Sequence, residues 1–345
     1  MNNRAAYLAA IKQYEVKDAP MPAIEKDTDV LVKIEYVGIC GADLDMWETG
    51  RYGIFNVEYP QIIGHEASGV VVETGKAVSN VKPGDCVAME PGIPCGVCPH
   101  CVTGKYNLCP NVVFKGAPPV TGCNQKYVTH PAQWCFVLPE GLPTRDGALL
   151  EPLAVGMHAA NQGGVNMGDT VVICGGGTIG LSALNACKAK GATKILVVEQ
   201  SPVRLQAAER MGAVTIDFSK YDVARKVMEL TDGCGADVVI EASGSAKAFL
   251  LCPNLLRSGG TVACVGLGPN PVIEMDYQAA IYKEITFKTV ARYRHVYPRC
   301  ITGLAAGLLS TEGIITHEFS YENIQEAYDF AFNNKDIAIK TLVKF

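Results

Sequence analysis

The sequence predicts an α/β protein with two domains, and three observations lead to this prediction. The chain has 345 residues, whereas single cores rarely grow beyond roughly 250–300 residues. The first part consists of short β-branched stretches between Gly and Pro clusters, which is typical of a mostly antiparallel β domain. From about residue 165, apolar strands alternate with helix-length segments. That alternation predicts βαβ units and a parallel sheet.

The composition points to a small-molecule partner. A formal net charge of −5 opposes binding to a nucleic-acid backbone, which needs a basic surface. No apolar run approaches the roughly 20 residues of a membrane helix, and the N-terminal YLAAI is cut short by Lys12, so we expect neither membrane insertion nor a secretory signal. The 14 cysteines therefore favour reduced thiols and metal ligands over disulfides. We expect a soluble protein in the cytoplasm.

A glycine-rich loop predicts a dinucleotide site. Residues 175–180 read GGGTIG, directly after the strand-like TVVIC and at the start of a helical segment. In this context the G-x-G-x-x-G spacing predicts a Rossmann domain, with the cofactor diphosphate on the positive end of the helix. The alternative is a glycine-rich turn that binds nothing. The residues predicted to contact the cofactor in this loop are Gly175, Gly177, Thr178, Ile179 and Gly180.

The end of the next predicted strand favours NAD over NADP. The segment KILVVE ends in Glu199, about 20 residues after the loop, where a carboxylate binds both ribose hydroxyls and repels a 2′-phosphate. Arg204 follows five residues later and belongs to the same predicted cofactor site. It is either a solvated helix residue, which we favour, or a phosphate clamp.

Four cysteines in fifteen residues predict a zinc site. The stretch CGVCPHCVTGKYNLC contains Cys95, Cys98, Cys101 and Cys109. Four thiolates close the tetrahedral shell of Zn²⁺ and leave no position for substrate, so the site is predicted to be structural. The acidic charge disfavours a nucleic-acid zinc ribbon, and an iron–sulfur cluster usually has another spacing. His100 is the alternative fourth ligand that we disfavour.

An open metal site is predicted from earlier residues. Cys40, His65 and Glu66 offer a thiolate, an imidazole and a carboxylate, and leave a fourth position for an exchangeable ligand. Glu151, flanked by apolar residues, is a direct ligand or holds the metal-bound water. Asp43 is suited to accept a hydrogen bond from the second ring nitrogen of His65.

The combination resembles a known family. GHEASGVVVETGKAV at 64–78 has the Gly-His-Glu form of the zinc-dependent medium-chain alcohol dehydrogenases, and the cysteine loop and glycine motif follow in that family's order. Within the family, EPLAVGMHA and ARYRHVYP resemble the sorbitol (polyol) dehydrogenase branch. The resemblance implies a GroES-like catalytic domain at 1–153 with a structural-zinc lobe at 90–110, a Rossmann domain at 154–292, and a return to the catalytic domain at 293–345.

The resemblance also implies an activity and an assembly. It implies two zinc ions per chain, one catalytic and one structural, NAD(H) as cofactor, and a homo-oligomer, either a tetramer or a dimer. The catalytic zinc would be held by Cys40, His65 and Glu66, with Glu151 on the zinc water. Arg292 and Tyr293 match the polyol-binding pair of the branch. The expected reaction interconverts a secondary alcohol of a polyol and its ketone.

The sequence departs from the branch near the predicted substrate. The branch has a serine at the position of Ala42, and this serine passes the alcohol proton outward. Because Ala42 has no hydroxyl, we predict Glu151 as the proton acceptor and Asp45 as the group that relays the proton to solvent. Met46 and Phe114 are the other predicted substrate contacts, and Lys115 follows in the sequence. A different polyol, a cyclic polyol, a sugar or a sugar phosphate are therefore open as substrates. A non-catalytic NAD-binding relative is the alternative from another class.

Overall fold

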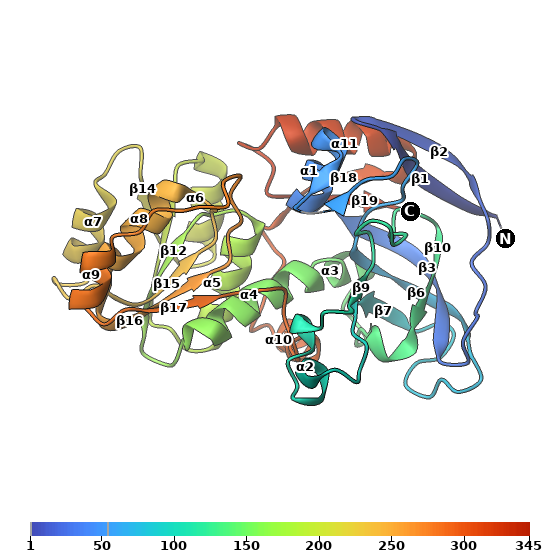
Figure 1. Cartoon of the computed structure of the whole chain (residues 1–345), viewed down its shortest axis with the longest axis horizontal. Helices are drawn as coiled ribbons and strands as arrows, with labels where there is room; N and C mark the ends of the chain where they lie inside the picture. The colour runs from blue at the N-terminus through green and yellow to red at the C-terminus, as the bar shows by residue number, and fades with distance from the viewer. Residues whose placement is uncertain (1, 54) are drawn as a thin grey trace. The chain divides into compact units, whose positions relative to one another are not determined.

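A computed structural model of the chain describes residues 2–53 and 55–345 (Figure 1). Contacts between Cα atoms divide the chain into two compact units. Unit 1 comprises Met1–Glu151 and Ile315–Phe345, and unit 2 is the continuous segment Pro152–Ile314. The domain boundaries predicted at 153 and 292 stay predictions. Within the part of the chain that the structure describes, no helix combines the length and apolarity needed to span a lipid bilayer.

Unit 1 is built on a seven-stranded sheet. Its order is β11-β7-β6-β3-β19-β18, with β10 also paired to β3. Every pairing in this sheet is antiparallel except the parallel pair β18–β19. The prediction of a mostly antiparallel β domain is therefore confirmed. The strands are β3 (Asp29–Gly38), β6 (Glu66–Thr74), β7 (Cys86–Met89), β10 (Tyr127–Pro131), β11 (Cys135–Val137), β18 (Ile315–Ser320) and β19 (Lys340–Lys344).

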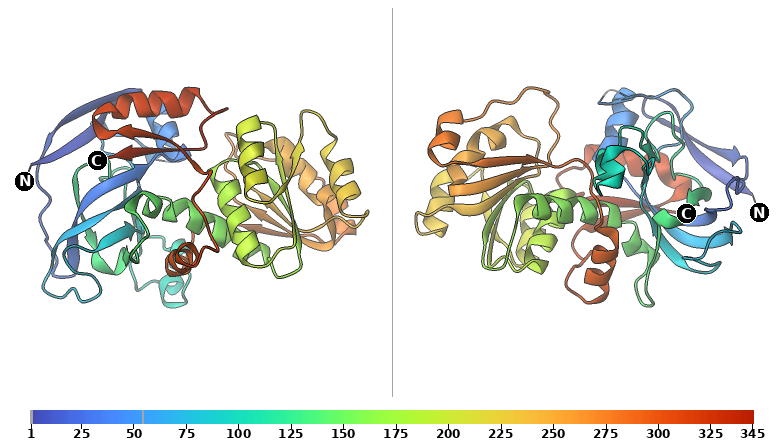
Figure 2. Two further views of the ribbon diagram at one scale, coloured as in Figure 1. Left: turned by 180° about the vertical axis from the view of Figure 1, so that it is seen from behind. Right: turned by 60° about the horizontal axis from the view of Figure 1, so that its bottom comes forward.

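Smaller elements complete unit 1. Helix α11 (Ile324–Asn333) lies against β18, β19 and helix α1 (Gly41–Thr49), as the left view of Figure 2 also shows. Trp47 and Tyr328, both almost fully buried, join these helices in one hydrophobic core. The short strand pairs are β1 (Asn3–Ala10) with β2 (Gln13–Ala19), β4 (Arg51–Tyr52) with β5 (Phe55–Asn56), and β8 (Gly92–Ile93) with β9 (Val113–Phe114); the short helices are α2 (Pro99–Val102) and α3 (Thr144–Gly147).

Unit 2 contains a six-stranded sheet in which every pair is parallel. Its order is β14-β13-β12-β15-β16-β17, so the order reverses between β12 and β15. Strands such as KILVVE and ADVVIE have continuous apolar centres because both faces of a parallel sheet are covered. The strands are β12 (Thr170–Cys174), β13 (Lys194–Glu199), β14 (Val214–Asp217), β15 (Ala236–Glu241), β16 (Leu256–Cys264) and β17 (Thr286–Thr289).

Helices cover both faces of this sheet (Figure 2). One layer contains α5 and α6, and α7 packs on α8 in the other. This doubly wound arrangement places a nucleotide site where the strand order reverses, and the prediction of a Rossmann sheet is confirmed. The helices are α5 (Thr178–Ala189), α6 (Pro202–Arg210), α7 (Val223–Leu230), α8 (Ala246–Leu255), α9 (Tyr277–Tyr282) and α10 (Tyr297–Ala305); α4 (Leu150–Gly163) begins in unit 1 and ends in unit 2.

Candidate metal centres and nucleotide pocket

The fold of unit 1 brings Cys40, His65 and Glu66 together. One ligand atom from each of these residues lies within 4.8 Å of the others. Cys40 precedes the first turn of α1, His65 precedes β6, and Glu66 is the first residue of β6. The two segments meet because β3 and β6 are antiparallel neighbours, with Gly38 opposite Glu66. A soft thiolate, an imidazole and a carboxylate fit Zn²⁺ with one position left open.

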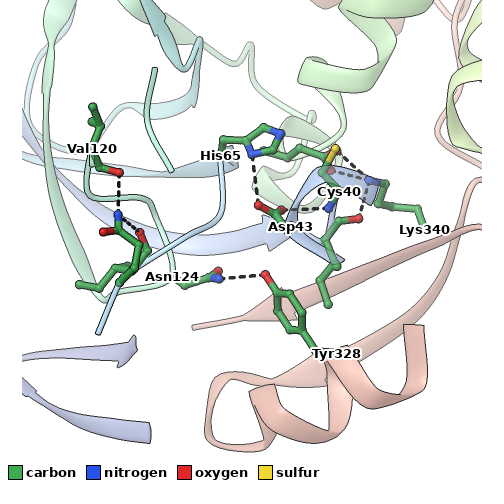
Figure 3. Close-up of polar contacts among 11 residues, drawn as sticks. Cys40, Asp43, His65, Val120, Asn124, Tyr328 and Lys340 are labelled. Carbon is green, nitrogen blue, oxygen red and sulfur yellow. Dashed lines mark hydrogen bonds and ion pairs between the residues drawn. The ribbon is translucent and has the colours of Figure 1, made fainter. Parts of the chain in front are cut away.

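Asp43 orients the imidazole of His65. Its Oδ1 lies 3.4 Å from His65 Nδ1, and its Oδ2 accepts a hydrogen bond of 3.0 Å from the backbone N–H of Cys40 (Figure 3). Burial lowers the pKa of His65, but the Asp43 carboxylate and the Cys40 thiolate outweigh burial and raise this pKa well above its ordinary value. Because Asp43 occupies the Nδ1 side, Nε2 is the nitrogen that faces a metal.

A lysine that the sequence did not reveal holds Glu66. Lys340 Nζ lies 2.8 Å from Glu66 Oε1 and 2.7 Å from Oε2, and it also donates to the carbonyl oxygen of Ile39 at 2.8 Å. The two side chains are 3% and 1% exposed. Burial opposes the charge of Lys340, but Glu66 and Cys40 outweigh it and raise the pKa of the ammonium. A metal centre here therefore has a fixed cation beside it.

Glu151 and Asp45 differ in their surroundings. Glu151 is 7% exposed, lies in the first turn of α4, and is not part of the three-residue ligand group, although its charge reaches Lys340. Asp45 is exposed on α1. Partial desolvation raises the pKa of its carboxyl, with Lys335 opposing and Glu48 adding to the shift. The structure thus leaves Glu151 the more enclosed of the two carboxylates.

The predicted substrate contacts have different locations. Phe114 lies edge-on to His65, with ring centroids 5.4 Å apart. Met46 is 2% exposed in the core with Trp47, which accounts for an apolar residue at position 46 without a substrate. Arg292 and Tyr293 belong to unit 2. Arg292 has a left-handed φ of 54°, and Tyr293 is buried with its ring 5.6 Å from that of Tyr297.

The four cysteines of the predicted lobe also converge. The Sγ atoms of Cys95, Cys98, Cys101 and Cys109 all lie within 4.8 Å of one another. Backbone N–H groups around Cys98 stabilise the Cys95 thiolate and lower its pKa to about 6, whereas desolvation and shared hydrogen bonds raise the pKa of Cys101 to about 12. The four sulfur atoms are close enough together to be ligands of one metal ion. His100 is exposed and outside the group.

The glycine loop of unit 2 has the geometry of a phosphate cradle. Gly175 follows β12 with a left-handed φ of 102°. A Cβ on Gly180 would lie 1.8 Å from the Gly175 carbonyl oxygen, so only glycine permits this approach of helix and strand. Gly177 is the N-cap of α5 and has no side chain to occupy the helix end. Thr178 and Ile179 form the first turn of that helix, where N–H groups attract an anion.

A cavity of about 450 Å³ adjoins the loop. Gly175, Gly177, Glu199 and Arg204 are among the residues that line it. Glu199 Oε2 accepts from the Gly176 N–H at 2.9 Å, while Oε1 accepts from the two backbone N–H groups that follow Glu199. Arg204 Nη1 lies 3.6 Å from Glu199 Oε2. The carboxylate is thus fixed where the first two strands of a dinucleotide fold receive a ribose.

Comparisons with known proteins agree with this architecture. Residues 26–140 match the family described as "Alcohol dehydrogenase GroES-like domain", and residues 178–306 match "Zinc-binding dehydrogenase". The chain is 37% identical to a sorbitol dehydrogenase of Bacillus subtilis, over 99% of this chain and 97% of that protein. It is 38% identical to D-xylulose reductase A of Aspergillus niger, over 99% and 96%.

A solved structure is similar throughout. It is an Escherichia coli oxidoreductase/dehydrogenase of unknown specificity, 39% identical, with a TM-score of 0.95 over 100% of this chain and 99% of that one. The protein belongs to the zinc-type medium-chain alcohol dehydrogenase family. It is an enzyme of that family, with a GroES-like β domain and a Rossmann-like sheet. The predicted family and fold are confirmed.

Proposed function

We propose that the protein is a zinc- and NAD(H)-dependent dehydrogenase that interconverts a secondary alcohol of a polyol, of the sorbitol or xylitol kind, and the corresponding ketone. The observation that carries this proposal is the convergence of Cys40, His65 and Glu66, whose ligand atoms lie within 4.8 Å, in a chain similar to sorbitol dehydrogenases. When bound, zinc would lower the pKa of the alcohol as a Lewis acid, and the nicotinamide would take the hydride.

The chain's own residues have separate roles in this proposal. Asp43 keeps His65 in one tautomer through the 3.4 Å contact at Nδ1. Glu151, enclosed at the start of α4, accepts the proton of the alcohol, and the exposed Asp45 passes it to solvent. Phe114, Met46 and the unit 2 residues Arg292 and Tyr293 are the proposed substrate contacts, and Met46 also packs in the core.

NAD is the proposed cofactor because Glu199 lines the nucleotide cavity with a fixed carboxylate. A 2′-phosphate would meet this charge, and the cavity lining offers two cations to compensate it, Arg204 and Lys247. Catalytic efficiency with NAD and with NADP tests the assignment. Equal or better use of NADP would show that Arg204 governs the pocket.

The deciding experiment is a substrate panel. Zinc-loaded protein is given linear polyols, cyclic polyols, sugars and sugar phosphates with NAD, and the corresponding ketones with NADH, while absorbance at 340 nm is followed. The proposal expects turnover of a linear polyol and its ketose. Preference for another group would move the substrate class but keep the dehydrogenase. No turnover of any member by a protein that holds both zinc ions would favour a non-catalytic NAD-binding relative.

The four-cysteine group is proposed as the second, structural zinc site.

A homo-oligomer is also proposed, with the contact between copies made by unit 2. Strand β17 lies at the end of the six-stranded sheet, so one of its edges is unpaired in the sheet order. Nearby large apolar side chains are exposed, including Leu267 at 81%, Val272 at 82% and Tyr282 at 85%. Light scattering of the purified protein measures the assembly. A cytoplasmic location stays a prediction of the sequence.

A further inference from the structure

The carboxylate of Glu66 has a fixed setting on unit 1. It extends over the end of β3, where a Cβ on Gly38 would lie 2.1 Å from Glu66 Oε2. Strand β19, on the other side of β3, begins with Lys340, and its ammonium reaches both oxygens of Glu66. The glycine thus provides the space, and the lysine provides the charge that keeps the carboxylate in it.

Lys340 has no hydrogen-bonding capacity left over. An ammonium group carries three N–H donors, and the structure gives it three acceptors: Glu66 Oε1, Glu66 Oε2 and the Ile39 carbonyl oxygen, at 2.7–2.8 Å. The pair is almost completely buried. In such a setting the two charges depend on each other, because removal of one leaves the other buried without compensation.

Two of the proposed ligands, His65 and Glu66, have side chains of opposite charge beside them. An anion, Asp43, lies behind His65 and makes the imidazole a stronger electron-pair donor. A cation, Lys340, lies behind Glu66 and withdraws electron density from the same oxygens that a metal would bind. Lys340 also repels a nearby dication directly. The centre therefore has one reinforced ligand and one weakened ligand.

We propose that Lys340 is a positioning residue that weakens the bond between Glu66 and the metal and so makes Glu66 the exchangeable protein ligand of this centre. The proposal rests on the zinc site of the proposed function, although not on the identity of the substrate. A carboxylate already shared with an ammonium can leave the metal without becoming an unpaired buried charge. His65 and Cys40 have no such cation hydrogen-bonded to them among the interactions that the structure describes.

Three variants separate charge from packing. Lys340→Gln removes the positive charge but keeps an N–H donor for Glu66, Lys340→Arg keeps the charge, and Lys344→Gln is a matched control at the exposed end of the same strand. The affinity for the more labile zinc is titrated against a competing chelator, with the zinc that remains counted per chain. We expect Lys340→Gln to bind zinc about 10-fold or more tightly than the unaltered protein. Lys340→Arg and Lys344→Gln should stay within about 3-fold.

The outcomes decide between the proposal and a structural role. Unchanged or weaker zinc binding by Lys340→Gln would overturn the proposal, as would equal tightening by Lys340→Arg. If Lys340→Gln does not fold without metal, zinc release from the zinc-loaded protein to excess chelator replaces the titration; slower release supports the proposal, and equal or faster release overturns it. Because zinc binding is the readout, a failed substrate panel leaves this test intact, and a failed zinc test leaves the substrate assignment intact.

Discussion

The two ligand groups of unit 1 differ in how the chain builds them. Four thiols between Cys95 and Cys109 meet through tight local turns, and all four are the same kind of ligand. The group of Cys40, His65 and Glu66 uses three kinds of ligand from two segments that meet only when β3 pairs with β6. A local set of four closes the shell of a metal, whereas an assembled set of three leaves a position open.

The difference extends to the neighbours of each group. In the four-thiol group, backbone N–H groups are the main stabilisers of the Cys95 thiolate. Around the three-ligand group, Asp43 and Lys340 place opposite full charges next to two different ligands. A centre that only stabilises the fold needs a closed shell, while a catalytic centre needs an open position. This contrast yields effects on stability at one group and on activity at the other.

The largest effect is expected at the four-thiol group. Cys98→Ser removes one thiolate from the closed shell, so the structural metal is lost and the unfolding temperature should fall by about 10 °C or more. Differential scanning calorimetry and a zinc count per chain measure both results. The protein that remains folded should keep its other zinc. A variant of normal thermal stability that is inactive would reverse the roles of the two groups.

His65→Ala tests the other side of the comparison. Loss of the imidazole removes a ligand that Asp43 holds in place, so turnover should fall by about 10³-fold or more. The unfolding temperature should change far less than in Cys98→Ser, since the four-thiol group is untouched. Steady-state rates are compared with zinc content and calorimetry. A large loss of stability together with the retention of four-thiol zinc would contradict this division.

Glu151→Gln sharpens the comparison within the open centre. Glu151 is buried but outside the three-residue group, and its charge reaches Lys340, so its amide analogue should keep zinc and NAD binding. Turnover should fall by roughly 10²-fold, the scale of a lost general base. Asp45→Asn, at an exposed position, is the control and should cost less. Near-normal turnover of Glu151→Gln across the pH range would remove Glu151 from the proton path.

The smallest effect is expected at His130, which contacts Glu90 at the start of the four-thiol lobe. His130 Nε2 lies 2.9 Å from the carbonyl oxygen of Glu90, and burial, with the nearby Lys115 charge, lowers the pKa of His130 to about 3. His130 has a pKa of about 6.5 in the unfolded chain and about 3 in the folded protein, so between these pH values only the unfolded chain binds a proton there. Folding stability therefore falls as the pH falls, by about 2 kcal/mol from pH 7 to pH 5.

His130→Gln keeps a donor for the Glu90 carbonyl and has no titrating group. Its loss of stability between pH 7 and pH 5 should therefore be smaller than that of the unaltered protein by about 2 kcal/mol. Urea unfolding at the two pH values measures this difference. His100→Gln, on the exposed face of the same lobe, is the control. Identical pH dependence of His130→Gln and the unaltered protein would exclude His130 as the source.

Local patterns carried most of the fold prediction. The alternation of apolar strands and helices predicted the parallel sheet of unit 2, because each βαβ unit is contiguous in the chain. The glycine loop and Glu199 were found for the same reason, and the structure places both at one cavity. The pairing of β19 with β3 was outside such reasoning, since it depends on two segments about 300 residues apart in the sequence.

The site was predictable only as far as residue chemistry is distinctive. Thiols, a His–Glu pair and a nearby Asp drew attention by type and spacing. Lys340 did not, because a lysine in a terminal strand usually faces solvent and its partner Glu66 is 274 residues away. Apolar residues on both sides of it, IAI before and LV after Thr341, were the one available signal. Met46 was predicted as a substrate contact, and helix position alone did not reveal that it also packs beside Trp47 in the core.

Unit 1 consists of two chain segments, so its folding can be completed only after the second segment has been synthesised. Unit 2 is continuous, so it can fold on leaving the ribosome, while the earlier segment of unit 1 still lacks β18 and β19. Until β19 emerges, the 36–38 end of β3 lacks its partner strand and Glu66 has no ammonium beside it. If Lys340 weakens Glu66 as proposed, the bond from Glu66 to zinc takes its final strength only when β19 joins the sheet.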